Sequence, residues 1–279
     1  MTLAPPTGTA VDLNIRDYLS GSGARLAGAS NFIMQLAWPG VGYGVKDSKV
    51  ESGSAIKHPV KRARTTFTYL AVSMMGTEED IRVFRKAVNK QHAQVRSDAD
   101  SPVQYSAMDP RLQLWVAACL YYGTVDIHKK MYGPLPDAEA DALYAYCARF
   151  GTSLQVRADM WPKDRQAFAE YWEEGLKEVS IDEPVRDFLL SLMRYEHAHP
   201  LIQKAAAERS EFFTTGFLPP MFRDALGLAW DDAKQAEFDR RVKRVGRINK
   251  RLPEPVRLFP FNALLWDMRR RHRKGIPLV

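Results

Sequence analysis

The sequence between Glu78 and Arg96, EEDIRVFRKAVNKQHAQVR, has the period of an amphipathic helix and carries a histidine on its apolar side. Apolar residues recur every three or four positions, which is the spacing of one helix face. The members of this face are Ile81, Phe84, Val88 and Val95. His92 takes the position between Val88 and Val95, so we expect its imidazole to point inward. The remaining positions are mostly charged or amide residues, which predicts that only one side packs on a core.

Thr77 marks the expected start of this helix. Its hydroxyl can cap a free backbone N–H, and the helix dipole favours the acidic residues that follow it at positions 78–80. The inward histidine has two interpretations. A lone inward histidine is more often a hydrogen-bonded core residue than a ligand of a metal or cofactor.

The preceding segment, VKRARTTFTYLAVSMMG at 60–76, favours the ligand interpretation. It predicts a largely apolar helix with a row of polar residues at helical spacing along one face. The members of this row are Arg62, Thr66, Tyr69 and Ser73. A short turn joins this helix to the one that carries His92. We therefore expect the polar row opposite the histidine, where the two helices form a wall for a cofactor.

Length and composition indicate a single domain. The 279 residues are 46% apolar, enough for one large core, and no stretch has the composition of a linker or a repeat. We expect one domain over 1–279, with an N-terminal extension at 1–11 and a basic C-terminal tail at 272–279. Cys119 and Cys147 lie in apolar helical patterns without metal-ligand or redox spacing, which indicates buried thiols in a reducing compartment.

The N-terminus has neither the basic nor the apolar region of a signal peptide, and no apolar run is long enough to span a bilayer. These features predict a cytoplasmic protein without a transmembrane segment. The formal net charge is +7, and much of the excess lies between Arg240 and Lys274. No nucleic-acid-binding signature accompanies that cluster, so a solvated helix face and a frayed tail are expected rather than specific nucleic-acid binding. The sequence does not indicate an oligomeric state.

The rest of the chain predicts an all-α fold of about ten helices, because no segment has the period-two pattern of a strand. A first helix is expected at 12–25, ended by Gly21 and Gly23, and a second at 27–38. The glycines in GVGYGV at 40–45 predict a flexible turn with close backbone approach, since their spacing does not fit a phosphate-binding loop. A central helix is expected at 111–122, an ordered apolar loop at 212–220 with a helix starting at Pro219 or Pro220, and a long basic helix at 231–250. The final helix, at 259–271, is expected to pack Leu264, Leu265, Trp266 and Met268 on the core.

The order of several short motifs resembles the rubber oxygenase and MpaB family, also described as DUF2236. The motifs are Gln35-Leu-Ala-Trp-Pro39, Arg62-x-x-x-Thr66, His92, Tyr105-Ser-Ala-x-Asp-Pro110 followed by Leu-x-Leu-Trp-Val, Thr215-Gly-Phe-Leu-Pro-Pro220 and Phe259-Pro-Phe-Asn262. Together they cover almost the whole chain. The family includes latex clearing proteins and a fungal oxygenase of mycophenolic acid biosynthesis.

The resemblance implies an all-α fold with a globin-like core that binds haem b. It implies that His92 is the proximal iron ligand and that Arg62 and Thr66 lie beside the haem, where they serve activity or haem retention. Some rubber-cleaving members have a lysine directly before that threonine, which can bind the iron from the distal side. Thr65 stands there in this chain, which argues against a lysine-capped state and against rubber as the substrate.

The function that follows is a haem-dependent oxygenase that acts with O₂ on a small apolar, unsaturated substrate of isoprenoid or lipid-like character, most simply by oxidative C=C cleavage. A haem-binding sensor or carrier without turnover is the alternative, because it needs the same His92. A third hypothesis is a structural or nucleic-acid-associated helical protein, with His92 as a core residue and the basic C-terminal region as the working surface. It leaves the arrangement of Arg62, Thr66 and His92 unexplained.

Overall fold

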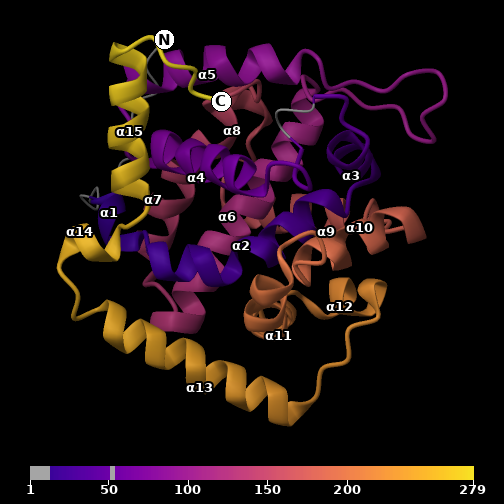
Figure 1. Ribbon diagram of the computed structural model, residues 1–279. Coiled ribbons are helices and arrows are strands. Elements are labelled where there is room, and N and C mark those ends of the chain that lie inside the picture. Colours follow the sequence, from indigo (N-terminus) through magenta and orange to yellow (C-terminus); the bar gives the residue numbers. More distant parts are fainter. Residues whose placement is uncertain (1–12, 51–53) are drawn as a thin grey trace.

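The computed structural model describes residues 13–50 and 54–279, and within them the fold is all-α, as predicted (Figure 1). The helices are α1 (Ile15–Tyr18), α2 (Gly21–Leu36), α3 (Pro39–Lys46), α4 (Pro59–Met75), α5 (Glu78–His92), α6 (Pro110–Tyr132), α7 (Asp137–Cys147), α8 (Arg149–Thr152), the 3₁₀ turn η2 (Ala158–Met160), α9 (Arg165–Lys177), α10 (Glu183–Met193), α11 (Pro200–Phe217), α12 (Pro220–Leu226), α13 (Asp232–Asn249), α14 (Glu254–Arg257) and α15 (Phe261–Arg273). The elements outnumber the expected ten partly because α1, α8 and α14 are single turns. The expected extension at 1–11 lies outside the described residues. The division into one domain and the globin-like core stay predictions.

Helix α6 is the centre of the main core, and it is longer than the predicted 111–122. Trp115 is fully buried and stacks between Trp38 and Trp172, with ring centroids 4.7 and 5.1 Å apart. Gly175 of α9 makes this stack possible, because a Cβ there would lie 2.8 Å from the Trp115 ring. Offset aromatic stacks add to the free energy of burial. The three indoles therefore fix α9 and the end of α2 against α6.

The prediction that Gly21 and Gly23 end a first helix is wrong, because both belong to the first turn of α2. The side chain of Ser20 caps this helix and accepts a hydrogen bond from the Gly23 backbone N–H at 3.0 Å. A Cβ on Gly23 would lie 2.5 Å from Ile127 of α6. The glycine is thus selected by close helix packing, and α2 continues without a break across position 26, where the first expected helix was to end and the second to begin.

The prediction of a flexible turn at 40–45 is also wrong, since GVGYGV forms most of α3. Pro39 occupies the first helical turn, where its missing N–H costs nothing. The expected close backbone approach is present, because a Cβ on Gly42 would lie 2.5 Å from the carbonyl oxygen of Leu36. The glycines let α3 pack closely against the end of α2.

Helices α4 and α5 form the predicted helical pair, with α4 between α5 and α2 in Figure 1. Thr77 caps α5 as predicted and forms a reciprocal capping box with Asp80. The Asp80 carboxylate also accepts hydrogen bonds from the Arg269 guanidinium of α15, the shortest at 2.6 Å. Phe84 and Val88 are buried, as the periodicity predicted. One carboxylate therefore fixes the start of α5 and its position against α15.

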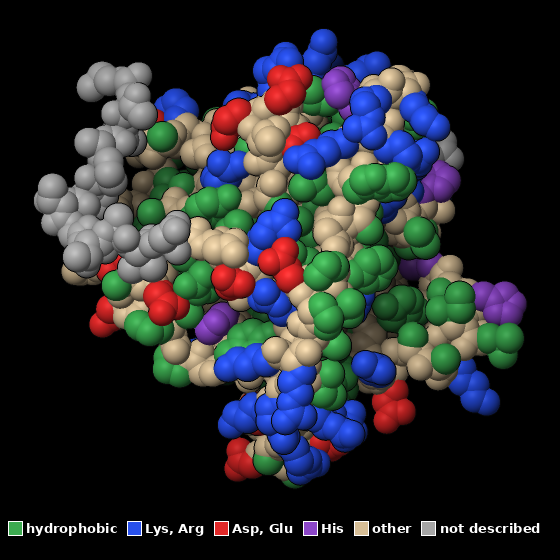
Figure 2. Space-filling model, turned by 90° about the vertical axis from the view of Figure 1, so that its left-hand side faces the viewer, with side chains coloured by type: hydrophobic (Ala, Val, Ile, Leu, Met, Phe, Trp, Pro, Cys, Tyr) green, Lys and Arg blue, Asp and Glu red, His purple; other side chains and the backbone are tan. Residues whose placement is uncertain are grey.

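The second half of the chain corrects one further expectation. The apolar segment at 212–220 is not a loop, because most of it forms the end of α11. The expected helix start is confirmed, since Pro220 begins α12. Gly216 permits this packing, since a Cβ there would lie 2.2 Å from the Phe238 ring of α13. Helix α13 confirms the predicted long basic helix. It forms the lower edge of the molecule in Figure 1, where Figure 2 shows gathered Lys and Arg side chains.

The C-terminal region differs in part from expectation. Leu265 and Met268 of α15 are buried as predicted, whereas Trp266 is 61% exposed. The tail does not fray, because Leu278 and Val279 pack against the core cluster of α4, α5 and α15. None of the helices in the described part of the chain is long and apolar enough to cross a membrane.

Candidate functional site

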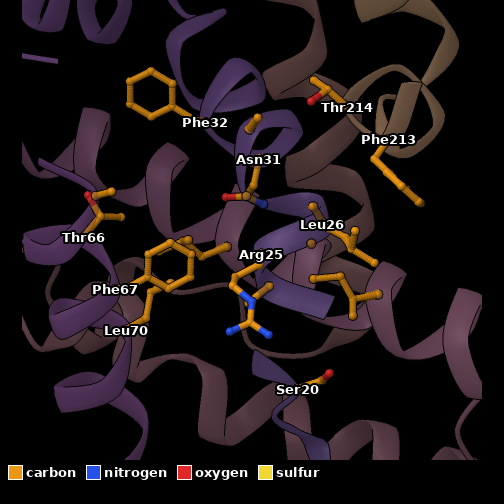
Figure 3. Close-up of a pocket in the computed structure, with 18 of the residues that line it drawn as sticks. Ser20, Arg25, Leu26, Asn31, Phe32, Thr66, Phe67, Leu70, Phe213 and Thr214 are labelled. Carbon is orange, nitrogen blue, oxygen red and sulfur yellow. The ribbon is translucent and has the colours of Figure 1, made fainter. Parts of the chain in front are cut away.

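A cavity of about 780 Å³ lies between α2, α4 and α11. In Figure 3, Thr66, Phe67 and Leu70 of α4 face Asn31 and Arg25 of α2, and Phe213 and Thr214 of α11 lie on another side. The lining is predominantly apolar and includes Phe32, Phe67, Leu70, Met74, Leu120, Ile127, Phe150, Phe213 and Phe261. A cavity of this size and composition suits an apolar organic ligand or a prosthetic group.

Arg62 and Thr66 both line this cavity, as the polar row of α4 predicted. They are four residues apart and therefore project from the same face of α4. The Nε atom of Arg62 is buried and has no hydrogen-bond partner. Burial also lowers the pKa of its guanidinium. A buried polar atom without a partner is costly, so the half-buried Arg62 is suited to bind an anionic or strongly polar ligand atom.

The Thr66 hydroxyl differs from those of its neighbours on α4. Thr65 donates a hydrogen bond to the Lys61 carbonyl at 3.0 Å, and Thr68 donates one to the Arg64 carbonyl at 2.8 Å. These bonds are internal to the helix. Within the described part of the chain, the Thr66 hydroxyl makes no hydrogen bond and borders the cavity. It is therefore available to a ligand.

Tyr69 and Ser73, the other members of the polar row, do not reach the cavity lining. The Tyr69 hydroxyl donates to the Phe150 carbonyl and shares a 2.9 Å hydrogen bond with Ser153. Burial raises its pKa. Ser73 donates to the Leu70 carbonyl at 3.2 Å. The expectation that the entire row forms one wall opposite the histidine is therefore wrong. Tyr69 instead bonds α4 to Phe150 and Ser153, at and just after α8, and the Ser73 bond lies within α4 itself.

Helix α2 supplies a polar wall that the sequence reasoning missed. The Gln35 amide donates to Asn31 Oδ1 at 2.7 Å, and the Asn31 amide donates to the Cys119 carbonyl at 2.6 Å. Ala24, Gly28, Asn31 and Gln35 all line the cavity at helical spacing. That period of small and amide residues was a usable signal. It was not recognised because Ala24 was assigned to one expected helix and the other three residues to the next.

His92 is the last residue of α5 and is not among the cavity-lining residues. Its Nδ1 atom is buried and has no hydrogen-bond partner. Burial, together with the positive charge of Arg62, lowers the pKa of the imidazole to about 4. The ring is therefore neutral at physiological pH, which is the form that binds metals. The structure thus places Arg62 and Thr66 together in the cavity lining. Arg62 is also close enough to His92 to affect its pKa, although His92 does not line the cavity.

Amide side chains fix the end of α5 beside His92. Gln155 donates through Nε2 to Asn89 Oδ1 at 2.7 Å, and the Gln155 backbone N–H donates to Gln113 Oε1 at 2.9 Å. Gln113 in turn donates to the Ala107 carbonyl at 2.6 Å. Ala107 belongs to the Tyr105–Pro110 motif. This motif therefore has a structural role, since it connects the last turn of α5 to the start of α6.

The other titratable candidates do not form a site. His128 shares a hydrogen bond with the Gly133 carbonyl, and His197 shares one with Ser191, while His199 caps α11. Cys119 and Cys147 are buried free thiols, as predicted. Among the described residues, no group of three or more His, Cys, Asp or Glu side chains is placed to hold a metal ion.

Comparison with protein families gives one match to this chain. The model for the catalytic domain of the ER-bound oxygenase mpaB/B′ and rubber oxygenase matches residues 16–247. The chain belongs to this MpaB and rubber oxygenase family. The resemblance noted from its motifs is thereby confirmed, and the matched domain is the catalytic domain of oxygenases, a class of oxidoreductases.

Two mycobacterial proteins are similar to almost the whole of this chain. Uncharacterised proteins of Mycobacterium bovis and Mycobacterium tuberculosis are each 49% identical to it over 251 residues. The match covers 90% of this chain and 98% of each mycobacterial protein. No solved structure matches the chain. The chemistry of this family member is therefore inferred from its own cavity.

Proposed function

We propose that this chain is a haem b-dependent oxygenase that acts with O₂ on a small apolar, unsaturated molecule of isoprenoid or lipid-like character. The observation that carries the proposal is the apolar cavity between α2 and α4, lined by Arg62 and Thr66, in a chain of an oxygenase family. The simplest reaction is cleavage of a carbon–carbon double bond. Each alkene carbon then gains one oxygen atom of O₂, so two carbonyl products form and no external electron donor is consumed.

Two observations fit haem. The cavity has an apolar lining and an arginine whose buried Nε has no hydrogen-bond partner, which suits a flat apolar group that carries carboxylates. His92 is a neutral imidazole with an unpartnered buried nitrogen, which suits an iron ligand. His92 itself does not line the cavity. Arg62 links the two, because it lines the cavity and its charge lowers the pKa of His92. Ligation by His92 is therefore tested separately from haem binding.

The proposed roles follow from the surroundings of each side chain. Arg62 neutralises a haem carboxylate or polarises an oxygen atom near the reacting bond, because its guanidinium has no protein partner. Thr66 donates a hydrogen bond from its free hydroxyl. The apolar walls orient the substrate and exclude water. When bound, haem supplies the capacity to bind and reduce O₂, which no side chain of the cavity provides.

The first test is a visible absorption spectrum of the chain expressed with added haem. We expect a Soret band that shifts with dithionite and carbon monoxide. His92→Ala should lose the band while retaining helical circular dichroism. The matched control is His128→Ala, which removes a histidine that already has a backbone partner and should keep the band. A wild type that stays colourless after haem titration would overturn the haem proposal.

Oxygen uptake then separates an oxygenase from the alternative, a haem-binding sensor or carrier. Uptake by the ferrous chain should rise with polyene or isoprenoid alkenes and not with their saturated analogues. A chain that binds haem but consumes no O₂ with any alkene supports the sensor or carrier. Retention of the Soret band in His92→Ala would leave haem in place and remove His92 as its ligand.

A further inference from the structure

Exposed hydrophobic side chains lie on two segments that contribute residues to the cavity lining. Val60 is 81% exposed, Leu201 72% and Ile202 53%, and Ile56 and Tyr195 are also exposed. Tyr195 itself lines the cavity, and the others are close in sequence to residues that do. We call the two segments 54–64 and 195–209 the mouth rim. Figure 2 shows hydrophobic side chains at the surface beside a hollow.

The mouth rim is also basic. Lys57, His58, Lys61 and Arg64 line a shallow groove that shares Pro59 with the cavity. Lys204 and Arg209 extend the positive charge onto α11, and Arg209 lines the cavity. Within the two segments the carboxylates are Glu196 and Glu208. Among the described residues, Lys61, Lys204 and Arg209 have no ion-pair partner, so their charge is available to an external anion.

Tyr195 gives the rim an unusual backbone. Tyr195 lies between α10 and α11 and has a φ of 55°. Among the residues that the structure describes, no other residue except glycine has a φ in the left-handed region. This conformation is uncommon for a bulky residue and is retained where the surrounding structure fixes it. It places a large, partly exposed aromatic side chain at the mouth. Tyrosine is a residue that combines an apolar ring with a polar tip and suits a membrane–water boundary.

We propose that the mouth rim docks the chain on the surface of an anionic lipid bilayer. Protruding aliphatic side chains enter the apolar layer, and the surrounding Lys and Arg side chains face the lipid phosphates. The cavity mouth then opens toward the bilayer. An apolar substrate passes from the membrane into the cavity without crossing water; this step rests on the proposed function, whereas docking rests on the surface alone.

A bilayer fits the rim better than a second copy of the chain. In a symmetric pair, the same basic segments would face each other, and like charges disfavour that contact. The rim also encloses an opening, so two rims would not bury a continuous surface. An anionic membrane complements both the charge and the exposed aliphatic side chains.

The test is co-sedimentation of the full chain with vesicles of phosphatidylcholine alone or of phosphatidylcholine with phosphatidylserine. We expect binding to the anionic vesicles that weakens as salt rises. The double variant Val60→Asp and Leu201→Asp should bind at least about tenfold more weakly. Both residues are exposed, so circular dichroism should show an unchanged fold.

The matched control is Ile248→Asp, which alters an aliphatic residue that is 52% exposed on the basic helix α13. This control should bind anionic vesicles as the wild type does. No binding by the wild type, or equal binding by the rim variant, would overturn the proposal. If only Ile248→Asp lost binding, the docking surface would be α13 and not the mouth rim. If the rim variant changed from a dimer to a monomer, the mouth rim would be a surface for self-association. No haem or turnover is read out, so failure here is distinguishable from failure of the oxygenase proposal.

Discussion

The positive charge of Arg62 lies near enough to His92 to lower the pKa of the imidazole, and each side chain leaves one buried nitrogen without a hydrogen-bond partner. Neither residue is explained by core packing, because buried polar groups are normally satisfied. Arg62 also lines the cavity, so the pair joins the last turn of α5 to the space between α4 and α2. The electrostatic coupling between these two side chains can be tested through the pH dependence of stability.

The protonation of His92 should make the haem-free chain less stable in acid. Its folded pKa of about 4 lies below the ordinary value of 6.5, so the unfolded chain binds the proton first as the pH falls. The contribution of neutral His92 to stability is nearly complete above pH 6.5 and declines toward pH 4, by at most about 1.4 kcal/mol per pH unit. Urea unfolding at pH 7 and pH 5 should show this slope in the wild type.

His92→Gln should remove that part of the pH dependence, because glutamine does not titrate. Arg62→Met should reduce it, since loss of the nearby cation raises the pKa of His92 toward its ordinary value. An equal slope in the wild type and in His92→Gln would show that the imidazole is not held neutral by its surroundings.

Asp80 should stabilise the chain through two partners at once. It caps α5 with Thr77 and accepts the Arg269 guanidinium. Asp80→Asn should therefore cost about 2 kcal/mol of unfolding free energy, a modest value because the Arg269 side chain is partly exposed. Denaturant unfolding of Asp80→Asn, Arg269→Met and the double variant gives the coupling between the two residues. Equal losses that simply add would contradict a shared role.

The contribution of Asp80 to stability should also depend on pH, because the folded structure lowers the pKa of its carboxyl. Burial raises the pKa of this carboxyl, but hydrogen bonds from Arg269 and Thr77 outweigh burial and hold it below 3.8. The stabilisation is therefore present above that value and is lost as the pH falls through the lowered pKa. The difference between wild type and Asp80→Asn should shrink in strong acid.

The sequence was most informative where local chemistry and helical period agree. Thr77, with acidic residues after it and apolar residues at regular spacing, defined α5, and the capping box confirms that reasoning. It was misleading where glycine serves packing instead of a turn. Gly23 and Gly42 both lie inside helices, because a neighbouring helix or carbonyl leaves no room for a Cβ. Such long-range contacts are not visible in local sequence.

The candidate site was predictable from one helix and not from the arrangement of helices. The i, i+4 spacing of Arg62 and Thr66 placed them on one face of α4, and both line the cavity. The opposite wall comes from α2 and α11, and periodicity does not specify which helices meet there. For the same reason the sequence predicted an inward His92 without showing that its ring lies outside the cavity lining.

Two glycine substitutions should change stability in opposite directions. Alanine is favoured over glycine inside a helix by about 0.5–1 kcal/mol. At Gly28 the new Cβ would lie 3.7 Å from Phe67, an ordinary contact, so Gly28→Ala should stabilise the chain. At Gly175 it would lie 2.8 Å from the stacked Trp115 ring, and overpacking costs about 1–3 kcal/mol. Gly175→Ala should therefore lower the melting temperature, and a stabilised variant would show that the indole stack can move.

Thr66 and Thr65 give a comparison of function against structure on adjacent residues. Thr66→Val removes a hydroxyl that borders the cavity without a protein partner, so the unfolding free energy should change by less than about 0.5 kcal/mol. Thr65→Val removes a hydrogen bond to the Lys61 carbonyl, which predicts a loss of about 0.5–1.5 kcal/mol. Oxygen uptake with an alkene should fall in Thr66→Val and stay near the wild-type rate in Thr65→Val. If both variants lost stability but neither lost uptake, the Thr66 hydroxyl would have no role toward a ligand, and the reacting end of the cavity would lie elsewhere along its lining.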